Sequence, residues 1–158
     1  MIIAISGSVG VGKTTISNLL SKETDYEVIH LNEIAKKYKI KDIDEIKTFD
    51  FDIEKLKSEV EQLIDGKDNL ILEGHFAHLL DPQKIDLLVV INRDLKYLTK
   101  EYDRREYPES KKKDNLEVEA FNLCFYEALE EGFDEGQVIS FFNDTEPEDL
   151  VSKIVNKI

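Results

Sequence analysis

The chain has 158 residues, enough for one domain built around a single hydrophobic core. Its 34 Asp and Glu residues outnumber its 21 Lys and Arg residues, and the net charge of -13 argues against strong direct binding to nucleic acid. A single cysteine, Cys124, excludes an internal disulfide and is expected to be a buried thiol. We find no signal peptide and no apolar run as long as a membrane span, so we expect a cytoplasmic protein.

Short β-branched apolar runs alternate along the chain with longer segments of helical periodicity. The runs predict five strands: Ile2–Ser6, Glu27–His30, Asn69–Glu73, Asp86–Ile91 and Gln137–Phe142. The periodic segments predict helices at Lys13–Glu23, Asn32–Lys39, Ile53–Ile64, Asp94–Glu106, Leu116–Glu131 and Glu148–Lys157. Strands that alternate with helices predict right-handed crossovers and a three-layer α/β fold around a parallel sheet. Residues 40–51 give no clear pattern, and Pro108 breaks the helical pattern within Tyr107–Lys113.

The first expected strand runs directly into a glycine-rich segment. Residues Gly7 to Thr14 match the phosphate-loop pattern G-x-x-x-x-G-K-[ST] at every specified position. The glycines allow the backbone N–H groups to turn inward, and the helix that follows directs its positive end at a bound anion. Lys13 would reach the β- and γ-phosphates, and Thr14 would offer its hydroxyl to Mg²⁺. The sequence therefore predicts an ATP site that uses magnesium.

Polar residues follow the third expected strand, where they could serve the phosphate loop. Glu73 could hold a magnesium-bound water, or it could be an ordinary carboxylate at a strand end. His75 could orient a water or a phosphate oxygen near neutral pH, because the free imidazole has a pKa of about 6.5. We therefore expect any hydrolysis that depends on His75 to weaken as the pH falls toward about 6. For His78, a structural role is as well supported as a functional one.

Planar, bidentate contacts to phosphate can come only from three arginines in this chain: Arg93, Arg104 and Arg105. Arg104 and Arg105 directly precede the break at Tyr107–Lys113, where a closing lid would bring a guanidinium over the phosphates. One of these two could instead be a solvated helix end, and the sequence leaves open which arginine contacts phosphate. Arg93 follows the fourth strand, at the edge where ligands of such sheets bind.

Four segments carry a resemblance to a known family: Ile3–Gly7, Glu73–Leu80, Arg104–Tyr107 and Asn115–Ala120. In order and separation they resemble the adenylate kinase isoenzyme 6 family in its short archaeal-type form. Three features depart from that family. The arginine after the fourth strand appears here as Asn92-Arg93. Family members usually have Arg-Gly-Tyr where this chain has Arg105-Glu106-Tyr107. They also have an arginine one helical turn before this motif, at the position of Glu101 in this chain.

The resemblance implies a nucleoside monophosphate kinase of adenylate kinase type that also hydrolyses ATP. It further implies a role in maturation of the small ribosomal subunit, through a small-subunit ribosomal protein as partner. In that family the chain would be one P-loop domain over residues 1–158, with strand order 2-3-1-4-5. AMP or a related monophosphate would bind at about residues 30–53, beneath a lid at about 104–114.

Carried over position by position, the resemblance implies three sets of site residues. The residues that bind ATP would be Gly10, Gly12, Lys13, Thr14, Thr15 and Arg105. The catalytic residues would be Lys13, His75 and Arg105, and the metal site would use Thr14 and Glu73. An ATP-driven assembly factor with incidental kinase activity remains an alternative, as does a kinase for another small acceptor.

Overall fold

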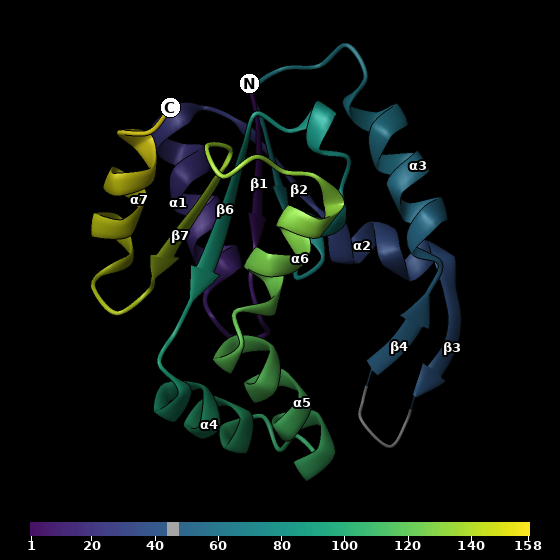
Figure 1. Cartoon of the computed structure of the whole chain (residues 1–158), viewed down its shortest axis with the longest axis vertical. Coiled ribbons are helices and arrows are strands. Elements are labelled where there is room, and N and C mark those ends of the chain that lie inside the picture. Colours follow the sequence, from purple (N-terminus) through teal and green to yellow (C-terminus); the bar gives the residue numbers. More distant parts are fainter. Residues whose placement is uncertain (44–47) are drawn as a thin grey trace.

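The computed structural model describes residues 1–43 and 48–158, and its centre is a five-stranded parallel sheet (Figure 1). The sheet consists of β1 (Ile2–Ser6), β2 (Glu27–His30), β5 (Leu70–Glu73), β6 (Leu87–Asn92) and β7 (Val138–Phe142). The strands lie side by side in the order β2-β5-β1-β6-β7. Counted in chain order among themselves, they follow the predicted order 2-3-1-4-5. The three central strands are buried along their whole length, as their uninterrupted apolar sequences predict.

Helices cover both faces of the sheet and form the outer layers of a three-layer α/β fold. One face packs against α1 (Lys13–Thr24) and α7 (Pro147–Val155). The other packs against α2 (Leu31–Ala35), α3 (Ile53–Ile64) and α6 (Leu123–Glu131). Alternate residues of β1 separate the two cores, since Ile3 and Ile5 face the first group of helices and Ala4 faces the second.

Two further helices, α4 (Leu95–Arg104) and α5 (Glu109–Ala120), lie beyond the carboxyl ends of the central strands (Figure 1). The aromatic ring of Tyr102 on α4 is fully buried, and its hydroxyl donates a hydrogen bond to the Val9 carbonyl at 2.5 Å. This bond ties α4 to the segment predicted to bind phosphate. The carboxyl edge of the sheet, α4 and α5 therefore enclose one region of the molecule.

The structure corrects the sequence prediction in two regions. Residues predicted without a clear pattern contain a hairpin of β3 (Lys39–Ile43) and β4 (Thr48–Phe51), which forms an antiparallel two-stranded sheet. The single helix expected at 116–131 is two helices, because Asn122 adopts a left-handed backbone conformation (φ 50°) between α5 and α6. Helix α5 also begins at Glu109, directly after Pro108 and inside the segment expected to be irregular.

Within residues 1–43 and 48–158, short 3₁₀ helices lie at Lys36–Tyr38, Ala77–Leu79 and Pro82–Lys84. The first of these continues α2, so the helix expected at 32–39 is a short α-helix followed by a tighter turn. Cys124 is buried, as predicted. Among the helices in the described ranges, none combines the length and the apolar character that crossing a bilayer would require.

Candidate nucleotide site

A cavity of about 360 Å³ lies at the carboxyl edge of the sheet, between the phosphate-loop segment and α4. Every sequence-predicted site residue lines it: Gly10, Gly12, Lys13, Thr14, Thr15, Glu73, His75 and Arg105. Arg93 and Tyr97 contribute to the same wall, whereas Arg104 does not line the cavity. The fold thus brings together residues that lie far apart in the sequence.

The loop from Gly7 to Gly12 adopts a conformation that requires glycine. Gly7 and Gly12 have φ values of 139° and 100°, in the region that residues with a Cβ rarely adopt. A Cβ on Gly7 would lie 2.2 Å from the Ile91 carbonyl oxygen, and one on Gly12 would lie 2.5 Å from the Asn143 side-chain nitrogen. Gly12 is also the N-cap of α1, so the positive end of that helix faces the cavity.

Lys13 is buried, with its ammonium group folded back onto the loop. Its Nζ donates hydrogen bonds to the carbonyls of Gly7 at 2.9 Å and Ser8 at 2.8 Å. Burial lowers the pKa of Lys13 to about 8, against the opposing attraction of nearby carboxylates, first among them Glu73. A phosphate that enters the loop would replace neutral carbonyls with full negative charges as partners of this ammonium.

Glu73 forms an oxygen-rich corner of the cavity together with Thr14. Its carboxylate is buried, and its Oε2 lies 3.4 Å from the Thr14 hydroxyl, which donates to it. The same oxygen lies 2.8 Å from Nδ1 of His30, at the end of β2. A carboxylate beside a hydroxyl is a donor set that suits Mg²⁺. The sequence analysis placed His30 at the start of the monophosphate segment but did not predict its contact with Glu73, because the neighbouring carboxyl ends of β2 and β5 are apparent only in the folded sheet.

His75 faces the cavity and is exposed there, and it makes an edge-on contact with the Phe76 ring at 4.7 Å between centroids. The pKa of His75 is lowered to about 4, first by the surrounding protein atoms and second by the positive charge of Lys13. The imidazole is therefore neutral near pH 6. The expectation that hydrolysis falls between pH 7.5 and 6 assumed the pKa of free imidazole, about 6.5, and a lowered pKa argues against it.

His78 has a structural role and lies outside the nucleotide cavity. Its ring is buried between Ser6 and Glu127, with Nδ1 at 2.7 Å from the Ser6 hydroxyl and Nε2 at 2.8 Å from a Glu127 oxygen. Because the Glu127 carboxylate can only accept, Nε2 donates to it, and a neutral ring then accepts the Ser6 proton at Nδ1. His78 thus connects the end of β1 to α6.

A second layer of side chains holds the phosphate loop from behind. Glu119 of α5 is buried and accepts hydrogen bonds from the Ser8 hydroxyl and, at 2.6 Å, from the Arg93 backbone N–H. Asn143 donates to the Val11 carbonyl at 2.8 Å. Glu119 lies in the segment Asn115–Ala120 that carries the family resemblance, but its contact with the loop was not predicted, and Asn143 belongs to no motif.

The arginines differ in their access to the cavity. The Arg93 guanidinium carbon lies 3.5 Å from the centroid of the Tyr97 ring, and both side chains face the cavity. Arg105 also faces it and donates from Nε to a Glu101 oxygen at 2.6 Å. Arg104 is 71% exposed and is held by the same carboxylate. Of the two lid arginines, the geometry favours Arg105 as the one that can contact phosphate.

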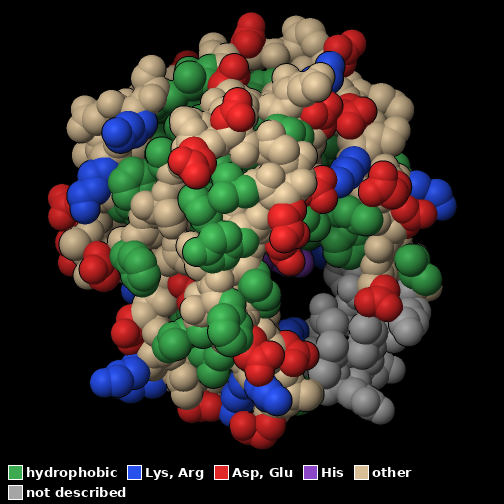
Figure 2. Space-filling view, in the orientation of Figure 1, with side chains coloured by type: hydrophobic (Ala, Val, Ile, Leu, Met, Phe, Trp, Pro, Cys, Tyr) green, Lys and Arg blue, Asp and Glu red, His purple; other side chains and the backbone are tan. Residues whose placement is uncertain are grey.

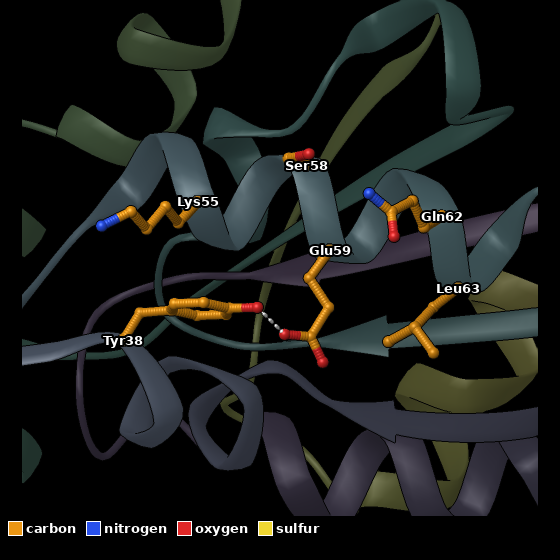
Figure 3. A pocket seen from close by; sticks show the side chains of 6 residues that line it. All are labelled: Tyr38, Lys55, Ser58, Glu59, Gln62 and Leu63. Carbon is orange, nitrogen blue, oxygen red and sulfur yellow. Dashed lines mark hydrogen bonds between the residues drawn. The ribbon is translucent and has the colours of Figure 1, made fainter.

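A larger hollow, of about 660 Å³, lies beside α3 and involves none of these residues (Figure 3). Its side chains are Tyr38, Lys55, Ser58, Glu59, Gln62 and Leu63. Glu59 accepts a hydrogen bond from the Tyr38 hydroxyl and pairs with Lys37 at 2.7 Å. No residue of the phosphate loop lines this hollow, whereas the loop and the N-terminus of α1 open into the smaller cavity. The nucleotide site is therefore assigned to the smaller cavity at the phosphate loop.

Comparisons with known proteins agree with this assignment. The family model described as "AAA domain" matches residues 3–122, which include the phosphate loop and the Glu73 and His75 segment. Among solved structures, the YorR protein from Bacillus subtilis, crystallised with phosphorylated GDP, has a TM-score of 0.68 and 20% identity, with 99% of this chain and 94% of that chain covered. The deoxyadenosine kinase of M. mycoides with bound dATP has a TM-score of 0.65 and 17% identity, with coverage of 99% and 98%. The fold and site define a P-loop protein of the AAA-domain class.

Curated relatives define the family more narrowly. A Thermococcus kodakarensis protein is 34% identical over 158 residues, with 100% of this chain and 85% of the relative covered. A Methanococcus maripaludis protein is 33% identical over 164 residues, with coverage of 98% and 87%. Both carry the name "Putative adenylate kinase". The chain belongs to this archaeal adenylate kinase-type family, and it is a phosphotransferase of the P-loop kinase kind.

Proposed function

We propose that this enzyme transfers the γ-phosphoryl group of ATP to AMP or a related nucleoside monophosphate. The observation that carries the proposal is the convergence of Lys13, Thr14, Glu73 and Arg105 on one cavity at the phosphate loop. Family membership supports the choice of acceptor, since the relatives are named as adenylate kinases. In-line transfer requires little covalent chemistry from a protein, chiefly orientation and charge stabilisation.

Each residue of the cavity has a distinct task in this proposal. Lys13 leaves its two loop carbonyls to bind the β- and γ-phosphates, and the loop N–H groups together with the α1 N-terminus hold the remaining phosphate oxygens. Arg105 stabilises the charge that spreads over the transferred group. Thr14 and Glu73 would hold Mg²⁺, which when bound neutralises charge on the phosphates.

The acceptor would lie between the phosphate loop and residues 30–53. In this range Asn32 lines the cavity and His30 contacts Glu73, and the β3–β4 hairpin extends away from the body of the molecule (Figure 1). Part of the range, residues 44–47, lies outside the described residues. The lid would be formed by residues 104–114, which comprise the end of α4, the turn that carries Arg105 and the first half of α5.

A hydrolytic activity is a second proposal, based on His75. Its neutral imidazole is exposed to the cavity, where it can orient a water or accept a proton from it. Transfer to a bound monophosphate has its nucleophile already in position and needs less help. Replacement of His75 by glycine should therefore reduce ATP hydrolysis without acceptor more than AMP-dependent ADP formation. Equal losses in both activities would contradict a specific role in hydrolysis.

The surface charge supports a basic protein as partner, and a small-subunit ribosomal protein in the cytoplasm is our proposal. Acidic side chains are distributed widely over the face shown in Figure 2, in keeping with the net charge of -13. Such a surface attracts a lysine-rich segment and repels bare RNA. Binding to a basic ribosomal protein should weaken as salt rises, and salt-insensitive binding to rRNA alone would contradict the proposal.

A further inference from the structure

The nucleotide cavity contains a carboxylate, Glu101, that the proposed reaction does not use. Three cations line the cavity (Lys13, Arg93 and Arg105), and the second carboxylate, Glu73, belongs to the oxygen-rich corner with Thr14. A carboxylate close to a triphosphate opposes its binding through charge repulsion. Glu101 would therefore weaken ATP binding unless the side chains paired with it offset its charge.

Glu101 lies on α4 one turn before two arginines and binds both. Its Oε1 accepts from Arg105 Nε at 2.6 Å and from Arg104 Nη2 at 2.7 Å, and its Oε2 accepts from Arg104 Nε at 3.0 Å. The separations i to i+3 and i to i+4 place all three side chains on one face of the helix. The Glu101 side chain is only 12% exposed, and its Cγ lies 3.5 Å from the position that a Cβ on Gly10 would occupy. The carboxylate is thus packed against the phosphate loop.

The two arginines hold Glu101 in its charged form. Hydrogen bonds from Arg104 first, and from Arg105 second, lower the pKa of Glu101 to about 2. Glu101 therefore remains an anion throughout the neutral range, and Arg105 remains paired with it while the nucleotide site holds no phosphate. A bound phosphate must compete with Glu101 for the Arg105 guanidinium.

The pairing of Glu101 with two arginines lowers the free energy needed to separate Arg105 from it. Arg104 binds Glu101 through two nitrogens and does not line the cavity, whereas Arg105 binds it through one nitrogen and faces the phosphate loop. When Arg105 turns to the phosphates, Glu101 keeps a bidentate partner in Arg104. When the Arg105 side chain moves from Glu101 to the phosphates, no buried charge is left without a partner. This movement therefore costs little free energy.

We propose that Glu101 is a positioning residue that holds Arg105 at the rim of the cavity and releases it to the phosphates of the bound nucleotide. Arg104 then acts only through Glu101, as its permanent counter-ion. The inference rests on the proposed function in so far as the ligand is ATP, but it does not depend on the acceptor. It also accounts for the adjacent pair of arginines, of which one contacts the cavity.

Binding of a non-hydrolysable ATP analogue with an imido bridge, measured with Mg²⁺ by calorimetry, tests the proposal without any acceptor. A partly exposed ion pair changes an equilibrium by a factor of about two to five. Glu101→Gln should therefore tighten binding by about two- to fivefold, because Arg105 no longer has a charged competitor for its guanidinium. Glu101→Asp, which restores the carboxylate, should return the affinity toward that of the wild type.

Two matched controls separate this mechanism from a general change in charge. Asp103→Asn changes the net charge by the same amount on the same helix, but Asp103 pairs with Lys112 and does not line the cavity. Its effect on binding should stay below about twofold. Arg104→Ala should weaken binding by about two- to fivefold in the wild type, because Glu101 then holds Arg105 more firmly. In the Glu101→Gln background the same replacement should have no effect.

The outcomes distinguish this proposal from the proposed function. If Glu101→Gln leaves the affinity unchanged or weakens it, Glu101 does not withhold Arg105 and the proposal is wrong. If Arg104→Ala weakens binding equally in both backgrounds, Arg104 contacts phosphate itself, which also overturns it. Failure of the wild type to bind the analogue would instead refute the ATP site as a whole.

Discussion

At the scale of single residues, the buried ammonium of Lys13 is the group most sensitive to its surroundings. It is held by two neutral carbonyls, and its pKa is lowered to about 8. The charged form binds phosphate, and a bound phosphate raises the pKa again, so ATP binding takes up a proton above pH 8. This linkage gives the loop a measurable pH dependence.

We predict that the Kd for ATP rises about tenfold between pH 7 and pH 9. In the protein without nucleotide, each pH unit above the pKa of Lys13 reduces the charged form of this side chain about tenfold, and the charged form is the one that binds ATP. Calorimetry in two buffers of different ionisation enthalpy would measure both the affinity and the proton uptake. Lys13→Arg is the matched control, because a guanidinium stays charged over this range. An identical pH dependence in the wild type and in Lys13→Arg would contradict the assignment.

His75 gives a second prediction at this scale. Because the pKa of His75 is lowered to about 4, its ring should remain neutral as the pH falls from 7.5 to 5. NMR titration of the ring protons of the three histidines, with His75→Gly to assign the signal, would measure this directly. Hydrolysis that depends on the neutral ring should then persist at pH 6. A midpoint near the ordinary value, about 6.5, would contradict the lowering of this pKa by the surrounding protein atoms and by Lys13.

Glu119 shows how a buried carboxylate can stabilise the phosphate loop from behind. Glutamine in its place keeps the shape but has one accepting oxygen and no charge. It can accept from the Arg93 N–H only if the Ser8 hydroxyl stops donating to this side chain, and both charge-assisted bonds are lost. We predict that Glu119→Gln lowers the free energy of unfolding by about 1–3 kcal/mol and raises the KM for ATP. Urea denaturation measures the first effect. Glu117→Gln on the exposed face of the same helix should change neither, and equal effects of the two variants would contradict a specific role for Glu119.

At the scale of elements, the turn between α4 and α5 contains an unusual backbone conformation. Glu106 has φ 54°, in the left-handed region that favours glycine. Glycine at this position would adopt the same conformation without strain, which should stabilise the folded state. The greater conformational freedom of glycine in the unfolded chain would offset part of this gain.

We predict that Glu106→Gly raises the stability by up to about 1 kcal/mol, or about 2–4 °C in Tm. Thermal unfolding followed by circular dichroism would measure the shift. Glu61→Gly, on the exposed face of α3 where the backbone is helical, is the matched control and should lower the stability by about 1 kcal/mol. A loss of stability in both variants would show that Glu106 is not strained.

The parallel sheet and the phosphate loop could be predicted from the sequence because their signals are local. Buried strands such as Ile2–Ser6 are continuous apolar runs, and the loop needs glycines at fixed positions. The β3–β4 hairpin was not predicted, because its strands have only five and four residues and no Asn-Gly or Asp-Gly turn signal joins them. Helix α5 is polar on most of its surface and so has no clear apolar stripe, and the turn at Asn122 interrupts a periodicity that continues into α6.

The candidate site could be predicted only in part, for a related reason. Motif positions such as Lys13 and Thr14 were identified because the phosphate loop specifies their spacing. His30 and Glu119 reach the site through the folding of distant segments, and one sequence alone does not record those contacts. The pKa of His75 likewise depends on its neighbours in space, which the value for free imidazole does not include.

At the scale of the whole molecule, an acidic protein contains a small cationic cavity. The formal net charge is -13, yet Lys13, Arg93 and Arg105 converge on one end of the sheet. Local groups in a low-dielectric site dominate the binding of a phosphate, whereas the distant surface charges are screened by salt. The fold therefore permits an anionic ligand in the cavity and a cationic partner on the outside.

Transfer of radiolabelled γ-phosphate from ATP, tested with AMP and with each other nucleoside monophosphate, is the most direct test of the central proposal. We predict that label appears in the β-position of ADP when AMP is present, and that Lys13→Ala reduces this transfer by at least about a hundredfold, because no other group replaces the lost ammonium. The proposal would be contradicted if the label appeared only in inorganic phosphate with every monophosphate tested, or if Lys13→Ala kept the wild-type rate at saturating ATP.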